Sequence, residues 1–181
     1  MQHQTYPVSR IGRLDNRLRL WLHPPERLFS EWARPGARCA DIGCGGGFVS
    51  VGLARLVGPS GQVTAIDLQP GMLERTGARA LLEGVRVETR ACTRESLVLP
   101  PELDLAVLFY VAHELSDWAV AVQQLHAALK VGGHLWLAEP PLIVGRTAWE
   151  ETVETALAQG FECVARPELT FARAAVLRRL P

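Results

Sequence analysis

The sequence predicts an α/β protein: one doubly wound sheet of seven strands, with the last strand pair antiparallel and helices on both faces. From about residue 38 onward, short β-like runs alternate with amphipathic helical patterns, which is typical of parallel βαβ units. A glycine-rich turn joins the first of these runs to the first helix. The last link, 167–172, is too short for a parallel crossover, so the two strands that it joins are expected to be antiparallel.

Each expected element is bounded by turn or capping residues. The expected strands are 38–42, 63–67, 85–89, 103–109, 134–139, 161–166 and 173–178. The expected helices are 48–57, 70–82, 118–129 and about 148–159. The pair Gly132-Gly133 is expected to stop the third helix, while a capping box at 147–150 opens the fourth and Gly160 ends it.

We expect a single domain over residues 1–181, with an α/β core at 38–181. The segment 1–37 precedes the alternation. Apolar residues from Ile11 to Leu22 fall on one face of a helix, and the run His23-Pro24-Pro25 ends that helix. A second short helix is expected at 26–32.

Composition excludes several classes of function. The formal net charge is zero, so no basic field exists to attract nucleic acid. The four cysteines form no C-x-x-C pair and follow no signal peptide, so we expect neither disulfides nor a metal site, and a cytoplasmic location. No apolar run approaches the roughly 20 residues that a membrane span needs.

The most informative motif is the turn after the first strand, which reads D-x-G-x-G-x-G from Asp41 to Gly47. Glycines at a strand-to-helix turn tolerate positive φ and let a ligand approach the backbone, and the amides at the helix start are hydrogen-bond donors. A dinucleotide fingerprint requires G-x-G-x-x-G or G-x-G-x-x-A, but the sixth position is Phe48 or Ser50 in the two possible registers. The loop therefore predicts a nucleoside-bearing cofactor other than NAD.

A second acid, Asp67, ends the second expected strand. A carboxylate at the carboxyl end of this strand can accept hydrogen bonds from both hydroxyl groups of a ribose. The pair of acids thus strengthens the prediction of an adenosyl ligand.

Together, the Asp41–Gly47 loop, Asp67 and the turn Leu129-Lys130-Val131-Gly132-Gly133 resemble the class I S-adenosylmethionine (SAM)-dependent methyltransferases, which have a Rossmann-like fold. The amino-acid sequence around Leu14–Asn16 and His23–Glu26 resembles that of a ubiquinone-biosynthesis-like group of methyltransferases, the methyltransferase type 11 group. The resemblance implies that SAM is the cofactor, S-adenosylhomocysteine (SAH) the product, and a small molecule of unidentified structure the methyl acceptor. It also implies that 1–37 forms a lid, and we expect a homodimer to help close the pocket.

The resemblance implies roles for particular residues. Asp41 orders the loop and positions the methionine part of SAM, the glycines let SAM lie against the main chain, and Asp67 holds the ribose. Cys92 stands where many members have an acid that binds adenine. The cofactor-binding residues implied are Asp41, Gly43, Cys44, Gly45, Gly47, Asp67, Leu68, Met72, Cys92, Thr93 and Phe109.

Two residues after the fourth strand are candidates for catalysis. His113 is a candidate general base, since its ordinary pKa is near working pH, and the alternative is a packing or capping histidine. Tyr110 is the second candidate, and the alternative is a pocket wall. The N/D-P-P-Y/F tetrad of the amino-methylating nucleic-acid enzymes is absent here, which disfavours methylation of bases.

Three other functions remain alternatives. A SAM-binding regulatory protein without transfer activity would keep the same loop and acids. An NAD-linked oxidoreductase is disfavoured by the glycine spacing. An arsenic methyltransferase would need a set of exposed thiolates, which Cys39 and Cys44 in the first strand and loop do not provide.

Overall fold

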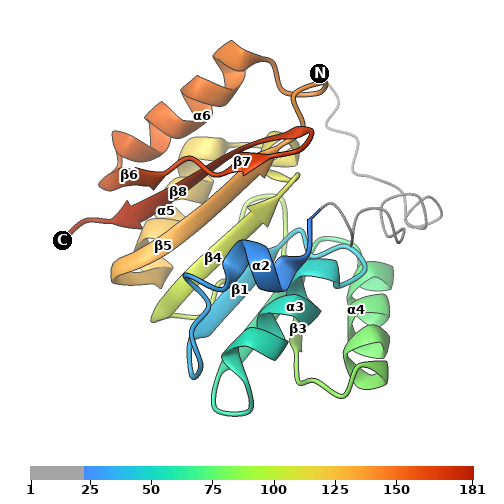
Figure 1. The fold of residues 1–181 in the computed structure, drawn as a ribbon. Helices are drawn as coiled ribbons and strands as arrows, with labels where there is room; N and C mark the ends of the chain where they lie inside the picture. Colours follow the sequence, from blue (N-terminus) through green and yellow to red (C-terminus); the bar gives the residue numbers. More distant parts are fainter. Residues whose placement is uncertain (1–22) are drawn as a thin grey trace.

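The computed structural model describes residues 23–181, and the expected helix at 11–22 lies outside this range (Figure 1). One mixed sheet forms the centre of the molecule, with strand order β3-β2-β1-β4-β5-β8-β6 and with β7 paired to β8. Strands β1 to β5 are parallel, and β8 runs antiparallel to β5, β6 and β7. The predicted α/β class and the antiparallel ending are confirmed.

The strands are β1 (Arg38–Ile42), β2 (Gln62–Asp67), β3 (Glu88–Ala91), β4 (Leu103–Phe109), β5 (Leu129–Glu139), β6 (Phe161–Ala165), β7 (Glu168–Leu169) and β8 (Ala172–Arg179). The helices are α2 (Pro25–Phe29), α3 (Phe48–Val57), α4 (Pro70–Leu82), α5 (Trp118–Ala128) and α6 (Arg146–Leu157), with a 3₁₀ turn η2 (Ala112–Glu114) after β4. Within the described residues, no helix combines the length and apolar character needed to cross a membrane.

The order of the strands distributes the helices over both faces of the sheet (Figure 1). From β1 the chain moves outward through β2 to β3, whereas from β4 it moves the other way to β5. Since parallel crossovers are right-handed, helices α3 and α4 cover one face and α5 covers the other. The helix α6 packs against α5, and α2 packs against α3.

Alternating strand residues form two buried clusters, one on each face of the sheet. Leu108 and Leu137 face the α5 and α6 side, where Trp149 is buried, while Val107 and Trp136 face the α2 and α3 side. Both faces of β4 and β5 are therefore buried, as expected for central strands of a doubly wound sheet.

Helix α2 is held on its face by a close approach to α3. A Cβ on Gly52 would lie 2.3 Å from Pro25 Cβ, so only glycine at position 52 admits this packing. The ring of Phe29, fully buried, meets Trp136 edge-on with ring centroids 4.9 Å apart. This contact positions the start of the described chain against β5.

Several predicted boundaries are wrong, among them the start of β5, which is Leu129 instead of 134, and three of the differences have a local reason. Strand β3 was expected at 85–89 but begins at Glu88, because the Val85 amide donates to Ala80 O and prolongs the turn after α4. The expected capping box is absent, since Gly145 is the N-cap of α6 and Thr147 lies inside the helix. The pair Gly132-Gly133 does not stop α5, which ends at Ala128 and leads directly into β5.

A further difference concerns the number of strands. The seven expected strands are present, and the link 167–172 contains an additional one, β7, which pairs Glu168 with Arg173 and Leu169 with Ala172. Phe171 in the turn has a left-handed φ of 59°, which lets the chain reverse within this short link.

Candidate functional site

A cavity of about 350 Å³ opens at the carboxyl ends of the parallel strands. In open α/β sheets this edge is where ligands bind, at the point where the strand order reverses, here between β1 and β4. Most of the predicted site residues line it: Asp41, Gly43, Cys44, Gly45, Asp67, Leu68, Met72, Cys92, Thr93, Tyr110 and His113.

The glycine loop has the left-handed backbone that its sequence predicted. Gly43, Gly45 and Gly47 have φ of 69°, 54° and 81°. The loop is held against β2 because the amides of Gly43 and Cys44 donate to Ile66 O at 2.8 and 3.0 Å. A Cβ on Gly43 would lie 2.3 Å from Val111 Cγ2, so the segment after β4 packs directly on the loop.

Asp67 lies at the end of β2 beside this loop. Its carboxylate accepts hydrogen bonds from the amides of Gly45, at 3.0 Å, and Gln69, at 2.9 Å. Burial raises the pKa of Asp67 above its ordinary value, and the hydrogen bonds from Gln69, Gly45 and Leu68 oppose that rise. The acid is thus presented to the cavity by backbone amides.

Asp41, at the end of β1, is almost fully buried, with 1% of its surface exposed. Ser50 Oγ on α3 donates to its carboxylate at 2.5 Å. This contact ties the start of α3 to β1 across the glycine loop. Asp41 thus lies beside the loop that the family resemblance assigns it to order, and its role toward SAM stays a prediction.

The two cysteines that line the cavity have unreactive surroundings. Cys44 Sγ lies 3.5 Å from Thr76 Oγ1, and burial raises the pKa of this thiol far above its usual range. Burial also raises the pKa of Cys92. A thiolate nucleophile is disfavoured at both positions because the thiolate form is scarce.

Leu68, Met72, Cys92 and Thr93 form one wall of the cavity. Two backbone amides on this wall are already engaged in the fold: Cys92 N donates to Asp67 O at 3.1 Å and Thr93 N donates to Ser96 O at 2.9 Å. The wall therefore offers apolar contact from Leu68 and Met72 rather than these two amides.

Two residues that were predicted to contact the cofactor do not line the cavity. Gly47 is the N-cap of α3, where an added Cβ would meet Thr76 atoms at 3.0 Å, so the glycine permits close packing of α3 against α4. Phe109 is 5% exposed and stacks on Trp136 with ring centroids 5.8 Å apart. Its side chain belongs to the buried cluster on the α2 and α3 side of the sheet.

The chain turns sharply after β4. Tyr110 has a left-handed φ of 68°, which is costly for an aromatic residue, and its amide donates to Ala138 O at 2.9 Å on β5. Its side chain lines the cavity, and its ring lies 4.4 Å from that of Phe109. The strained backbone of Tyr110 thus lies at the edge of the cavity.

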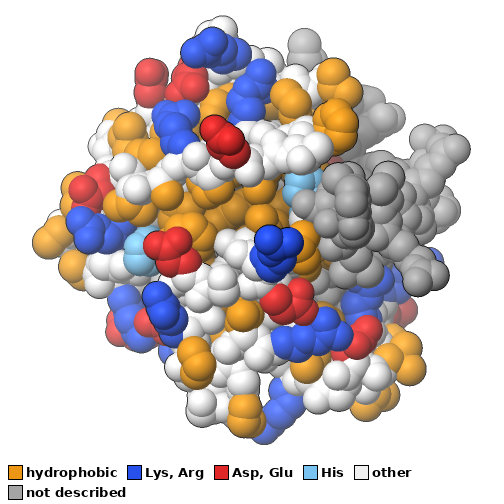
Figure 2. All heavy atoms as spheres, in the orientation of Figure 1, with side chains coloured by type: hydrophobic (Ala, Val, Ile, Leu, Met, Phe, Trp, Pro, Cys, Tyr) orange, Lys and Arg blue, Asp and Glu red, His pale blue; other side chains and the backbone are white. Residues whose placement is uncertain are grey.

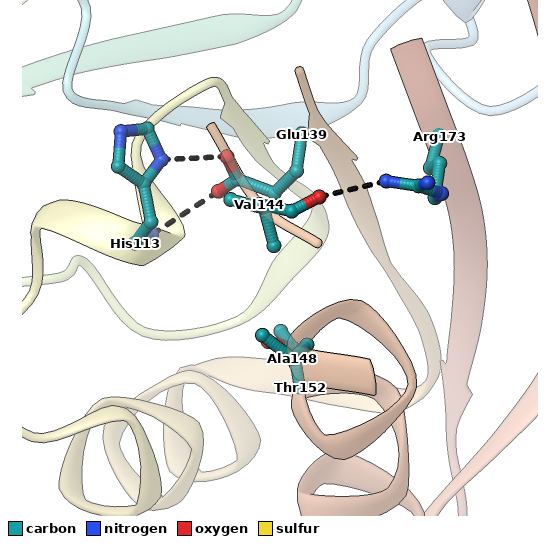
Figure 3. A network of polar contacts seen from close by, with 6 residues as sticks. All are labelled: His113, Glu139, Val144, Ala148, Thr152 and Arg173. Carbon is teal, nitrogen blue, oxygen red and sulfur yellow. Dashed lines mark hydrogen bonds and ion pairs between the residues drawn. The ribbon is translucent and has the colours of Figure 1, made fainter. Parts of the chain in front are cut away.

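His113 on η2 is bound by an acid that the sequence reasoning did not single out. Glu139, at the end of β5, accepts a hydrogen bond from the backbone amide of His113 at 3.2 Å and contacts His113 Nδ1 at 2.6 Å (Figure 3). Glu139 is 1% exposed, whereas the His113 side chain is 25% exposed and lines the cavity. The expected strand ended at Glu139, so an acid at the carboxyl end of the strand beside β4 was the available signal.

The hydrogen bond with Glu139 is the main cause that raises the pKa of His113 above its ordinary value. Burial opposes this rise, and the charges of Glu139 and Glu114 add to it. Glu114 also lines the cavity, and burial raises its pKa.

The loop after β5 is held in place from β8. Arg173 donates to the carbonyl of Val144 at 2.7 Å (Figure 3). Pro140 and Ile143, in the same loop, line the cavity. Arg173 thus anchors the segment that closes one side of the site.

Charged side chains of both signs are mixed on one face of the molecule. On the face shown in Figure 2, basic and acidic side chains mix around a band of hydrophobic surface, without an extended patch of one sign. Within residues 23–181, no three His, Cys, Asp or Glu side chains are grouped as metal ligands would be.

A doubly wound sheet with a glycine loop after β1 and an acid at the end of β2 is typical of α/β proteins that bind a nucleoside-bearing cofactor. The methyltransferase domain family matches residues 39–133, more than half of the chain, and covers the loop, both acids and His113. The chain belongs to this family, the class I SAM-dependent methyltransferases, whose cofactor is SAM.

Relatives of known name agree with this assignment. A ubiquinone biosynthesis O-methyltransferase of Xanthomonas campestris is 35% identical over 108 residues, which is 59% of this chain and 44% of that protein. A 2-phytyl-1,4-naphtoquinone methyltransferase of Nostoc is 31% identical over 132 residues, or 67% of this chain and 58% of that protein. The chain thus spans about half the length of these curated relatives.

The fold is shared with a SAM-dependent methyltransferase from Aquifex aeolicus, whose crystal structure has a TM-score of 0.87 and 24% identity. That similarity covers 97% of this chain and 100% of the other. It supports the predicted Rossmann-like architecture over nearly the whole length of the chain.

Proposed function

We propose that this protein transfers a methyl group from SAM to a hydroxylated ring compound of the quinol type. The observation that carries the proposal is the arrangement at the carboxyl edge of the sheet. There Asp67, the glycine loop and His113 line one cavity. The cofactor side is formed by β1 and β2, and the catalytic candidates come from the segment after β4.

The residues present fit SAM. Gly45 and Gly46 line the cavity without side chains that would keep a ligand from the backbone. Asp67 stands beside them, where ribose hydroxyl groups can donate to its carboxylate. Leu68 and Met72 supply an apolar wall for adenine, and Asp41 holds the loop toward the methionine end. SAM supplies a methyl group on a cationic sulfur, so the protein mainly has to align the acceptor and exclude water.

Two observations favour a mostly apolar acceptor with a polar handle. The cavity wall contains Val111, Leu115 and Ile143 beside His113. The Xanthomonas and Nostoc relatives are named for quinone-related substrates.

Within this site, Tyr110 and His113 are proposed to face the acceptor. Tyr110 forms the wall beside the glycine loop, and its aromatic ring suits a flat acceptor. The imidazole of His113 is the proposed general base, which would accept the proton of a hydroxyl acceptor.

Calorimetric titration with SAM, SAH and NADH tests the cofactor assignment. We expect binding of SAM and SAH and no binding of NADH. Transfer of label from methyl-labelled SAM to hydroquinones and naphthohydroquinones then tests the activity. SAM binding without label transfer to these probes would overturn the quinol acceptor. If extract metabolites also yield no SAH, the protein is a SAM-binding regulatory protein, and NADH binding without SAM binding would overturn the proposal.

A further inference from the structure

We infer that Glu139 is a positioning residue for methyl transfer: it orients His113, which accepts the proton of the acceptor's hydroxyl group. The inference rests on the proposed methyl transfer and deepens it, because it assigns oxygen as the accepting atom. It adds Glu139, a residue outside the cavity lining, to the function of the site.

The geometry of the pair points to this role. Both carboxylate oxygens of Glu139 engage His113, one at Nδ1 and the other at the backbone amide, at 2.6 and 3.2 Å. A carboxylate that accepts from Nδ1–H holds the neutral imidazole in the tautomer whose Nε2 has a free lone pair. The same carboxylate stabilises the ring when it becomes a cation.

The other ring nitrogen is available to a ligand. In Figure 3, His113 Nε2 points away from Glu139, and the ring lines the cavity. Among the described residues, nothing hydrogen-bonds Nε2, whereas Glu139 has no access to the cavity of its own. The buried acid Glu139 therefore contacts one nitrogen of the His113 ring, and the other ring nitrogen is on the side of the ligand cavity.

Charged groups around the pair strengthen the base. Glu114 on η2 adds its charge to that of Glu139, and the pKa of His113 is raised with the Glu139 hydrogen bond as the largest cause. Asp67 from β2 and Arg94 from the loop after β3 line the same cavity, while Arg173 on β8 is directed at Val144 O. Since a stronger base removes a proton from a weakly acidic hydroxyl more readily, the arrangement suits an oxygen acceptor.

The step balances without a further reactant. His113 Nε2 takes the hydroxyl proton, and an electron pair of the acceptor oxygen forms the bond to the methyl carbon. The bond from that carbon to sulfur breaks, and its electron pair stays on sulfur. The positive charge that was on sulfur ends on the imidazolium, which Glu139 stabilises.

The test compares four variants: His113→Ala, Glu139→Gln, Glu139→Asp and, as a matched control, Glu150→Gln. Glu150 is an exposed acid that pairs with Arg166 on the surface, so its amide variant loses an ion pair far from the cavity. Transfer from SAM to 4-nitrocatechol, 4-hydroxybenzoate and 1,4-naphthohydroquinone is followed across pH. The histidine ring is followed by nitrogen-15 NMR in the same proteins.

We expect His113→Ala to lower kcat by about 10²- to 10⁴-fold, which is the usual contribution of a general base. Glu139→Gln and Glu139→Asp should each lower kcat at least about tenfold, with KM and SAM affinity within about twofold of wild type. The pH profile of kcat/KM should follow the NMR titration of His113, and both should move to lower pH in Glu139→Gln. The control should match wild type.

Several results would overturn the inference. One is an NMR spectrum that places the proton of the neutral ring on Nε2 in the wild type. Another is a pH profile that stays in place in Glu139→Gln although the His113 titration moves. A loss confined to thermal stability would assign Glu139 a structural role only. Label transfer to none of the three probes, with SAM binding intact in calorimetry, would overturn the hydroxyl assignment and leave the cofactor assignment standing.

Discussion

Gly43 and Val111 lie in contact across the site, so that a methyl group on Gly43 would stand 2.3 Å from Val111 Cγ2. The glycine belongs to the loop after β1 and the valine to the segment after β4. Through this contact the cofactor loop and the segment that carries the catalytic candidates are packed as one unit.

Gly43→Ala should therefore destabilise the fold and weaken SAM binding. The left-handed φ of 69° costs about 1–2 kcal/mol for an L-residue, and the clash with Val111 adds about 1–3 kcal/mol. Urea unfolding measures the first effect and calorimetry with SAM the second.

Gly84→Ala is the matched control for this variant. Gly84 has a φ of 66°, but an added Cβ would meet nothing within 4 Å, so only the backbone cost is expected. In the double variant Gly43→Ala with Val111→Ala the clash is relieved, so part of the lost free energy of unfolding should be regained. Equal losses in Gly43→Ala and Gly84→Ala would contradict the packing argument.

Asp67→Ala should raise the Kd for SAM by about 10- to 100-fold, since each hydrogen bond to a charged acceptor contributes about 1.5–3 kcal/mol. Calorimetry measures this change. Asp104→Asn is the control: Asp104 accepts from Arg38 N and Lys130 Nζ at the opposite end of the sheet, so it should leave SAM affinity unchanged. An unaltered Kd in Asp67→Ala would remove Asp67 from the cofactor site.

Gly52→Ala should lower the free energy of unfolding by about 1–3 kcal/mol, because the new Cβ would lie 2.3 Å from Pro25 Cβ and push α2 off α3. Gly77→Ala, in α4 with nothing within 4 Å of the added Cβ, should instead stabilise by about 0.5–1 kcal/mol. Thermal and urea unfolding distinguish the two. If both glycine variants stabilise the protein, the close approach of α2 is refuted.

The contribution of His113 to stability should depend on pH in a defined direction. Its pKa in the folded state is raised above the ordinary value of 6.5, so the folded state binds this proton more tightly than the unfolded state does. The contribution is complete below pH 6.5 and is lost as pH rises through the folded pKa. The stability difference between wild type and His113→Gln should therefore be about 1 kcal/mol near pH 5.5 and decline at alkaline pH. A difference that grows with rising pH would contradict the pairing with Glu139.

Much of the fold could be predicted because local signals agree with tertiary structure. The glycine loop, flanked by an apolar strand and an apolar helix, placed β1 and α3 at their observed bounds. The short link 167–172 revealed the antiparallel ending, although the pairing of β7 within it depends on contacts with β8 that no local pattern shows.

The errors arose where tertiary contacts override local patterns. Val85 and Val87 have the pattern of a strand. However, the Val85 amide donates to Ala80 O in the turn after α4, and pairing with β2 begins only at Glu88. Phe109 was expected at the cofactor because it ends β4. Its side chain packs on Trp136 in the buried cluster on the α2 and α3 side, and no local pattern shows that this strand-end ring is covered.

The site was predictable on the cofactor side and less so on the acceptor side. Asp41 and Asp67 lie within or next to a recognisable loop. By contrast, Glu139 and His113 are separated by a helix and most of a strand, and their contact requires β4 and β5 to lie side by side. A single acid at the end of a strand does not by itself identify a functional residue in a sequence.

The order of the strands has a consequence for how such a protein can diversify. The proposed cofactor contacts of Asp41 and Asp67 come from β1 and β2. Tyr110, His113 and Glu139 come from the ends of β4 and β5 and the turn after β4, on the other side of the switch in strand order. Changes in the latter pair of strands can alter the accepting atom while the cofactor contacts persist. The seam between β1 and β4, bridged by Gly43 and Val111, is therefore the natural boundary for exchanging acceptor specificity by recombination.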